Sequence, residues 1–169
     1  EKIEAGDKVY AVWMNKTVAM FTIGKKKLEK GMNILGAHID SPRMDVKQNP
    51  LYEKGGFAYL DTHYYGGIKK YQWVTLPLAI HGVIAKTDGE VVNVNIGEDK
   101  NDPVFCVTDL LIHLSQEQLK KRADSVIEGE QLDILFASRP LAGKEKEAVK
   151  EAALELLEKK YGMKEEDFL

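Results

Sequence analysis

Residues Gly36–Lys47 read GAHIDSPRMDVK in one-letter code, and this segment sets the fold class of the chain. It follows on from the short apolar run Met32–Ala37, which predicts a buried strand. Pro42 pushes the residue before it toward extended geometry and ends regular structure at that point. Ligand sites in open α/β sheets collect at the carboxyl ends of strands. The polar residues after this run therefore indicate a site at the edge of an α/β sheet.

His38 and Asp40 are the sharpest local signal in this segment. Residues i and i+2 of an extended chain point to the same side, so the imidazole and the carboxylate can meet. An aspartate bonded to one ring nitrogen fixes the tautomer and leaves the other nitrogen for a metal. The pattern is short, however, and it also suits a histidine in a polar turn with Asp40 capping the backbone. One histidine makes no zinc site by itself, since catalytic zinc needs at least three protein ligands.

The segments on the amino-terminal side predict the rest of that sheet edge. Lys8–Trp13 and Thr17–Ile23 are rich in Val, Tyr, Trp, Phe and Thr, which suit a pleated surface. Residues 14–16 between them suit a tight turn. The chain has no initiator Met and stops just after a predicted helix, so we expect a piece of a longer protein.

On the carboxyl-terminal side the pattern changes to short β-rich pieces separated by turn residues. Helices are predicted at Leu110–Lys121 and, more clearly, at Lys144–Tyr161, where apolar residues recur at helical spacing and Gly162 suits the C-cap. The spacing of the β-rich pieces indicates a small barrel or sandwich. The predicted strands are Phe57–Thr62, Trp73–Leu78, Gly82–Lys86, Val91–Ile96 and Leu132–Ala137.

Composition narrows the class of protein. The chain has 169 residues, with 24 Lys and Arg against 27 Asp and Glu, and a hydrophobic content of 44%, which is enough for a core. This charge balance offers no basic patch for nucleic acid. No apolar run approaches the roughly 20 residues that span a bilayer, and the charged opening Glu1–Lys8 does not resemble a secretory signal. We therefore expect a soluble cytoplasmic protein that binds neither nucleic acid nor membrane.

The other histidines and the single cysteine favour structural roles when taken alone. His63 lies in an aromatic stretch that suits a packed, hydrogen-bonded side chain, and His81 precedes a glycine at a predicted strand end. His113 follows three apolar residues and can cap the edge of a core. Cys106, between apolar neighbours, is interpreted as a small buried side chain, and one cysteine excludes a disulfide framework within the chain.

The segment Gly36–Lys47 resembles the aspartyl aminopeptidase and vacuolar aminopeptidase I family of zinc exopeptidases, in its bacterial branch. The likeness extends over essentially the whole chain, through Asn49–Glu53, Thr62–Trp73, Ile80–Val83 and Leu111–Leu114. The resemblance implies an α/β exopeptidase with an inserted β-rich domain that forms homodimers, from which a larger homo-oligomer is built. It also implies zinc chemistry on peptide substrates.

The resemblance implies roles for three residues. His38 matches the family's first zinc ligand, and Asp40 matches the carboxylate that orients this histidine. His113 looks like the histidine that the inserted domain contributes to a neighbouring subunit's active site. In the family a pair of zinc ions polarises the scissile carbonyl, and cobalt or manganese can replace zinc in such sites. The other family ligands have no counterpart here, so the chain alone is expected to be inactive.

These observations together predict an edge piece of a catalytic α/β sheet in residues 1–46 and a β-rich oligomerisation domain with helices in residues 47–169. We expect a fragment of a zinc aminopeptidase that removes N-terminal residues, with acidic residues as one candidate class. The alternative is a non-catalytic oligomerisation or binding module. A small β-rich ligand-binding domain that stands alone is a weaker third interpretation, because it leaves the segment His38–Arg43 unexplained.

Overall fold

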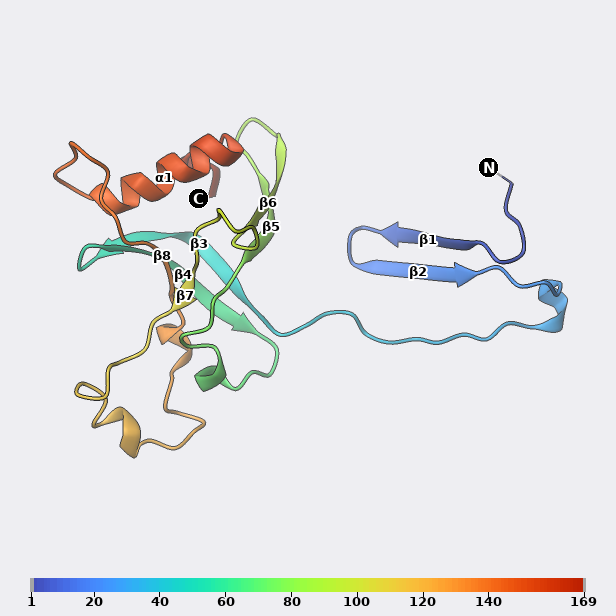
Figure 1. Ribbon diagram of the computed structural model, residues 1–169, viewed down its shortest axis with the longest axis horizontal. Helices are drawn as coiled ribbons and strands as arrows, with labels where there is room; N and C mark the ends of the chain where they lie inside the picture. Colours follow the sequence, from blue (N-terminus) through green and yellow to red (C-terminus); the bar gives the residue numbers. More distant parts are fainter. Residues whose placement is uncertain (1, 169) are drawn as a thin grey trace. The chain divides into compact units, whose positions relative to one another are not determined.

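The computed structural model describes residues 2–168, and these form two compact units that meet in sequence between Ser41 and Pro42. Figure 1 labels the strands of both units and the α-helix. The boundary expected from the sequence lay a few residues later, after Val46. The catalytic role assigned to residues 1–46 and the oligomerisation role assigned to residues 47–169 remain predictions.

The first unit is a β-hairpin followed by a segment without strands. β1 (Lys8–Trp13) pairs antiparallel with β2 (Thr17–Thr22) in continuous register, as the sequence predicts. Met14 and Asn15 in the turn both have positive φ angles, 51° and 53°. Two positive φ angles at its central residues are what a type I′ turn requires, and the Lys16 N–H donates to the Trp13 oxygen across this turn at 3.0 Å. Asn tolerates the left-handed conformation better than most residues.

The prediction of a strand at Met32–Ala37 is wrong: among the described residues, this run pairs with no other strand. After the short 3₁₀ helix η1 (Leu28–Lys30), residues 31–41 form no ladder with another described strand. Leu35 in the middle of the apolar run is 98% exposed. A strand exists only where a neighbour accepts and donates its backbone hydrogen bonds, and the described residues supply no such neighbour for this run.

The second unit is built on a four-stranded antiparallel sheet with the order β3-β4-β8-β7. Its strands are β3 (Arg43–Lys54), β4 (Phe57–Tyr65), β7 (Cys106–Val107) and β8 (Ile134–Ala137). The sequence did not predict β3. A register shift between Val46 and Leu51, where Asn49 has a φ of 49°, bends this strand and breaks its alternation.

A second hairpin and one helix complete the unit in Figure 1. β5 (Ile80–Ala85) pairs with β6 (Val91–Ile96), close to the predicted bounds. The helix α1 (Ala148–Tyr161) begins later than the predicted Lys144, because Lys144 lies in a turn that hydrogen-bonds back to Leu141. The remaining short 3₁₀ helices are η2 (Lys70–Gln72), η3 (Gln118–Lys120), η4 (Gly129–Gln131) and η5 (Glu165–Phe168).

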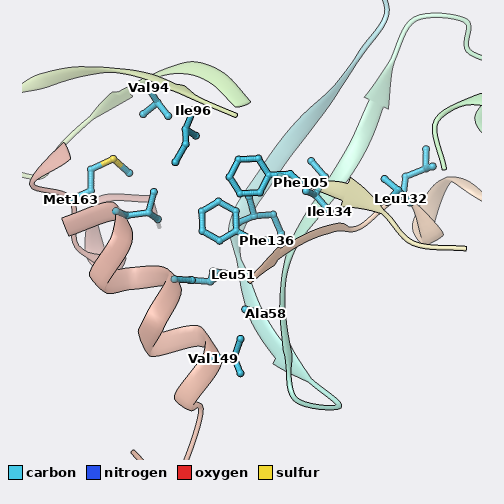
Figure 2. Packing of buried hydrophobic residues seen from close by; sticks show 14 of the residues in the cluster. Leu51, Ala58, Val94, Ile96, Phe105, Leu132, Ile134, Phe136, Val149 and Met163 are labelled. Carbon is cyan, nitrogen blue, oxygen red and sulfur yellow. The ribbon is translucent and has the colours of Figure 1, made fainter. Parts of the chain in front are cut away.

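One hydrophobic cluster joins the sheet, the hairpin and the helix of the second unit. Phe105 and Phe136 stack with ring centroids 4.9 Å apart at its centre (Figure 2). Val149 and Leu157 bring one face of α1 onto the cluster, and Ile96 brings the hairpin. Within residues 2–168, no helix combines the length and the apolar character that crossing a membrane requires.

Two further predicted elements differ in the structure. Trp73–Leu78 makes only isolated bridges, Val74 with Val107 and Leu78 with Phe105, instead of a strand. The helix predicted at Leu110–Lys121 is wrong: turns occupy this segment and only η3 is helical. Helices in proteins depend mainly on packing of an apolar face, and the apolar side chains of Leu110–Leu114 are exposed.

Candidate functional site

His38 and Asp40 lie side by side in the first unit, as their spacing predicts. Nδ1 of His38 is 3.1 Å from the backbone oxygen of Asp40 and 3.3 Å from Oδ1 of its carboxylate. With the proton on Nδ1, the ring donates toward Asp40 and leaves the lone pair of Nε2 for a metal ion. The His38 side chain is 86% exposed, so Nε2 is accessible to a metal ion.

The described residues fit one position of a zinc site. Within residues 2–168, no three His, Cys, Asp or Glu side chains gather closely enough to hold a metal ion. Zinc in a catalytic site takes at least three protein ligands. The donor set present is one accessible imidazole nitrogen with a carboxylate on the opposite ring nitrogen, which is the usual environment of a zinc-binding histidine.

His113 lies in the second unit, on an exposed turn segment instead of a helix. Large apolar side chains surround it in sequence, and all of them are exposed: Leu110, Leu111, Ile112 and Leu114. The hydroxyl of the buried Ser115 donates to the backbone oxygen of Ile112 at 3.1 Å and holds the turn. The segment thus presents an imidazole within an apolar surface, which is a feature of contact sites.

The other two histidines lie beside carboxylates on the surface of the second unit. His63 is exposed, with its Nε2 4.0 Å from Oδ2 of Asp45, so the packed position expected for it is wrong. His81 lies within β5, and its Nε2 is 3.1 Å from Oε1 of Glu98. Cys106 on β7 is half-buried. None of these residues joins His38 in a described cluster.

Sequence reasoning missed a polar group at the start of β3. Arg43 donates to both carboxylate oxygens of Asp45, and its guanidinium lies over the ring of Tyr65. The i, i+2 spacing of Arg43 and Asp45 after Pro42 was the available signal. This spacing predicts a contact only if a strand begins at residue 43, because alternate residues of a strand place their side chains on the same face.

Two further polar groups in the second unit have shifted pKa values. Hydrogen bonds to Glu130 and to Asp61 raise the pKa of Lys47. Burial, followed by the hydrogen bond to Asp133, raises the pKa of Tyr52. Lys47 therefore stays charged and Tyr52 stays neutral over the physiological range, and neither group is available for proton transfer near pH 7.

An apolar cavity of about 640 Å³ lies in the second unit between the β5–β6 hairpin and the main sheet. Trp73, Leu78 and Phe136 are among its walls. Arg43, Asp45, Lys47 and His81 also line it, and each of them is already paired with a side chain, Arg43 with Asp45 itself. The cavity therefore offers volume without a polar group free to orient a ligand.

Known proteins resemble the whole chain. The family model described as aminopeptidase I zinc metalloprotease (M18) matches residues 1–169. A probable M18 family aminopeptidase 1 from Clostridium acetobutylicum is 62% identical over 170 residues, covering 100% of this chain and 37% of the relative.

Solved structures agree with that match. The crystal structure of aminopeptidase I from Clostridium acetobutylicum aligns with a TM-score of 0.77 at 62% identity, covering 98% of this chain and 37% of that one. The crystal structure of an M18 family aminopeptidase from Thermotoga maritima aligns with a TM-score of 0.82 at 46% identity, covering 97% and 36%. The chain spans a little over a third of the length of these relatives, and over that span it belongs to the aminopeptidase I zinc metalloprotease family, M18.

Proposed function

We propose that the chain is part of a zinc-dependent aminopeptidase that removes N-terminal residues from peptides, with His38 as a zinc ligand. The observation that carries this proposal is the pairing of His38 Nδ1 with Asp40, which leaves Nε2 available and accessible. The match to a zinc metalloprotease family supports it. Homologous aminopeptidases of similar sequence support the reaction class.

The roles of the two residues follow from their contact. Zinc, when bound, supplies Lewis acidity at the scissile carbonyl. His38 holds the metal through Nε2. Asp40 accepts a hydrogen bond from the Nδ1–H group, fixes the tautomer and makes Nε2 a stronger electron-pair donor to the metal. We propose two zinc ions in each active site, with cobalt or manganese as possible substitutes, because imidazole and carboxylate ligands suit all three metals.

Further ligands must come from outside the described residues. A catalytic zinc ion needs at least three protein ligands, and residues 2–168 gather no such group. The relatives are nearly three times as long as the matched span, so they have the length to supply the rest. We therefore propose that the isolated chain does not hydrolyse peptides and that the complete polypeptide does.

His113 is proposed to act across a subunit boundary. It lies on a segment whose apolar side chains are exposed, and contiguous exposed apolar surface is typical of contact sites. In a homodimer this segment would enter the partner's active site, where the imidazole helps to bind substrate or to stabilise charge on the carbonyl oxygen. We also propose that such dimers assemble into a larger homo-oligomer.

The test of the proposal is His38→Ala in the complete polypeptide. We expect zinc content to fall and hydrolysis of aminoacyl substrates to be lost, because a zinc ligand has been removed. His81→Ala is the matched control, since His81 is another exposed histidine with a carboxylate partner. A His38→Ala enzyme that keeps its zinc and its turnover would contradict the assignment. Substrates with Asp, Glu or Leu at the N-terminus test the proposed preference for acidic residues.

A second candidate function is a non-catalytic oligomerisation module. The observation in its favour is that the second unit has its own hydrophobic core, independent of the unit that carries His38. Sedimentation of residues 42–169 tests this candidate. Self-association of this segment would favour the module over the enzyme if the complete polypeptide also shows no zinc-dependent hydrolysis of peptides.

A further inference from the structure

His113 is the third residue of a β-turn in the second unit. The N–H of Leu114 donates to the oxygen of Leu111 at 2.8 Å and closes this turn. Ile112 and His113 are its two central residues, so the peptide bond that joins them is the central peptide of the turn. His113 is not one of the residues with a positive φ angle. Types II and I′ require a positive φ at the third residue, so the turn belongs to neither.

The orientation of the central peptide decides which conformations are open to the His113 ring. Types I and II place the ends of a turn alike, but they differ by about 150° in ψ of the second residue and by about 170° in φ of the third. A change between them therefore turns the central peptide over. Histidine accepts a positive φ more readily than most residues, so its own backbone preference does not prevent this flip. The rotamers that a side chain can adopt depend on its φ and ψ angles, so a flip would redirect the imidazole.

Two side chains hold the central peptide in its observed orientation. The Ser115 hydroxyl and the side-chain amide of Gln116 both donate to the oxygen of Ile112, each at 3.1 Å. A backbone carbonyl has two lone pairs, so these two donors account for both. Turning the peptide over would break both hydrogen bonds. It would also leave the hydroxyl of the buried Ser115 without its acceptor, and an unsatisfied buried donor is costly.

The burial of Ser115 sets it apart from an ordinary turn serine of this chain. Ser125 makes the same kind of bond, from its hydroxyl to the backbone oxygen three residues earlier at 3.2 Å, but Ser125 is exposed. Ser115 is only 4% exposed, although its neighbours Leu114 and Gln116 lie on the surface. Water competes for the bond of Ser125 and is excluded from the bond of Ser115, so the Ser115 bond restrains its turn more strongly.

A second group of hydrogen bonds closes the base of the segment that carries the turn. One carboxylate oxygen of Asp109 accepts from the N–H of Leu110 at 2.8 Å and from the side-chain amide of Gln118 at 2.9 Å. The two ends of residues 109–118 are thereby joined. The apolar side chains of Leu110–Leu114 are exposed, so hydrogen bonds within the segment, and not the packing of these side chains, fix the conformation around His113.

We propose that Ser115, assisted by Gln116, is a positioning residue for His113. It fixes the central peptide of the turn, and through that peptide it limits the rotamers of the imidazole. Ser115 touches neither metal nor substrate in this role. The inference rests on the proposed function, in that His113 acts in the active site of a partner subunit, and it adds the group that orients the imidazole before the subunits meet. A preoriented group stabilises charge without the cost of reorganisation during the reaction.

The test uses the complete polypeptide with Ser115→Ala and Gln116→Ala, each alone and each combined with His113→Ala. Ser125→Ala is the control for the type of hydrogen bond, and Glu117→Ala is the control for an exposed position in the same segment. We expect Ser115→Ala to lower kcat/KM by about tenfold, which is less than the roughly hundredfold loss on removal of a charge-stabilising donor. Gln116→Ala should cause a smaller loss, because its bond is exposed. Both controls should retain the wild-type kcat/KM, and zinc content should be unchanged throughout.

The combination with His113→Ala separates positioning from folding. If Ser115 acts through His113, Ser115→Ala causes no further loss of kcat/KM once the imidazole is absent, so the two losses do not add. A residue needed only for folding would cause the same loss in both backgrounds, together with a lower thermal midpoint of unfolding. Gln116 is exposed, so Gln116→Ala keeps the test valid even where Ser115→Ala impairs folding.

Two kinetic results would overturn the inference. Values of kcat/KM for Ser115→Ala and Gln116→Ala that equal those of the controls would mean that the turn does not depend on these bonds. Losses that add fully to the loss in His113→Ala would assign Ser115 to folding alone. Full activity of His113→Ala would instead refute the proposed role of His113. Hydrogen exchange in the peptide that contains Leu114, measured by mass spectrometry, would then still decide whether Ser115 holds the turn. Exchange should be faster in Ser115→Ala than in Ser125→Ala, and equal rates would refute that hold.

Discussion

Glu53 at the end of β3 caps the helix α1 at Val149, 96 residues later in the chain. Oε2 of Glu53 accepts hydrogen bonds from the backbone N–H groups of Val149 and Lys150, each at 2.9 Å. The residue before the helix, Glu147, has a φ of 45° and makes no side-chain cap of its own. The cap therefore comes from the sheet, and the helix N-terminus is tied to β3.

Glu53→Ala should lower the free energy of unfolding by about 1–2 kcal/mol, because two N–H groups of the first helical turn lose their acceptor. Urea denaturation of the chain measures the change. Glu155→Ala on the exposed side of α1 is the matched control and should change stability by less than about 0.5 kcal/mol. Equal effects of the two substitutions would contradict the capping role.

Gly97→Ala should be among the most destabilising single substitutions in the second unit. Gly97 has a φ of 111°, and a Cβ there would lie 2.9 Å from both the Leu78 oxygen and the Ala79 Cα. Both neighbours are backbone atoms, so the chain itself must move, at a cost of about 2 kcal/mol or more. Gly82→Ala in β5 has open space around it and should be tolerated in the same denaturation assay.

Asp102 should make stability depend on pH in the acid range. The hydrogen bond from Lys160, followed by that from the Gly97 N–H, lowers the pKa of Asp102 in the folded state below its ordinary value. A lowered folded pKa stabilises the fold above the unfolded pKa, and this contribution disappears as the pH falls through the folded pKa. Wild type should therefore be more stable than Asp102→Asn at pH 7, with the difference shrinking below about pH 4.

The same comparison with Asp124→Asn provides the control, because Asp124 forms an exposed pair with Arg122. Thermal midpoints at pH 7, 5, 4 and 3 give the profile of each variant. A difference between wild type and Asp102→Asn that persists unchanged to pH 3 would mean that the Asp102 charge is not the source.

Asp40→Asn in the complete polypeptide should weaken zinc binding by roughly ten- to a hundredfold while leaving the fold intact. Asparagine keeps the shape of the side chain but loses the charge that holds the Nδ1 proton of His38. Chelator competition measures the affinity. Unchanged affinity would mean that Asp40 is only a polar turn residue.

His113→Ala should reduce turnover without loss of zinc, because His113 is proposed to bind substrate or to stabilise charge on the carbonyl oxygen and not to bind the metal. Mixing His113→Ala with His38→Ala subunits should restore some activity, since one mixed active site then has both histidines. Mass spectrometry must establish that mixed dimers form. Verified mixed dimers without activity would contradict the action of His113 across subunits.

The hairpins could be predicted from the sequence because their information is local. β1 and β2 are joined by a three-residue turn with Asn15 in a left-handed conformation, and β6 matches its predicted bounds at Val91–Ile96. The body of α1 was also predictable, since apolar spacing and Gly162 both lie within one segment. The start of the helix was not, because its cap, Glu53, is remote in sequence.

The sequence by itself determined the family, through Gly36–Lys47, and the pairing of His38 with Asp40, which needs only the i, i+2 geometry of an extended chain. Tertiary structure alone decided that β3 begins at Arg43 and that Leu110–Leu114 stays exposed instead of forming a helix. The physical reason is that a ladder or a helix face is stable only when a partner surface accepts it, and such partners lie far away in the sequence.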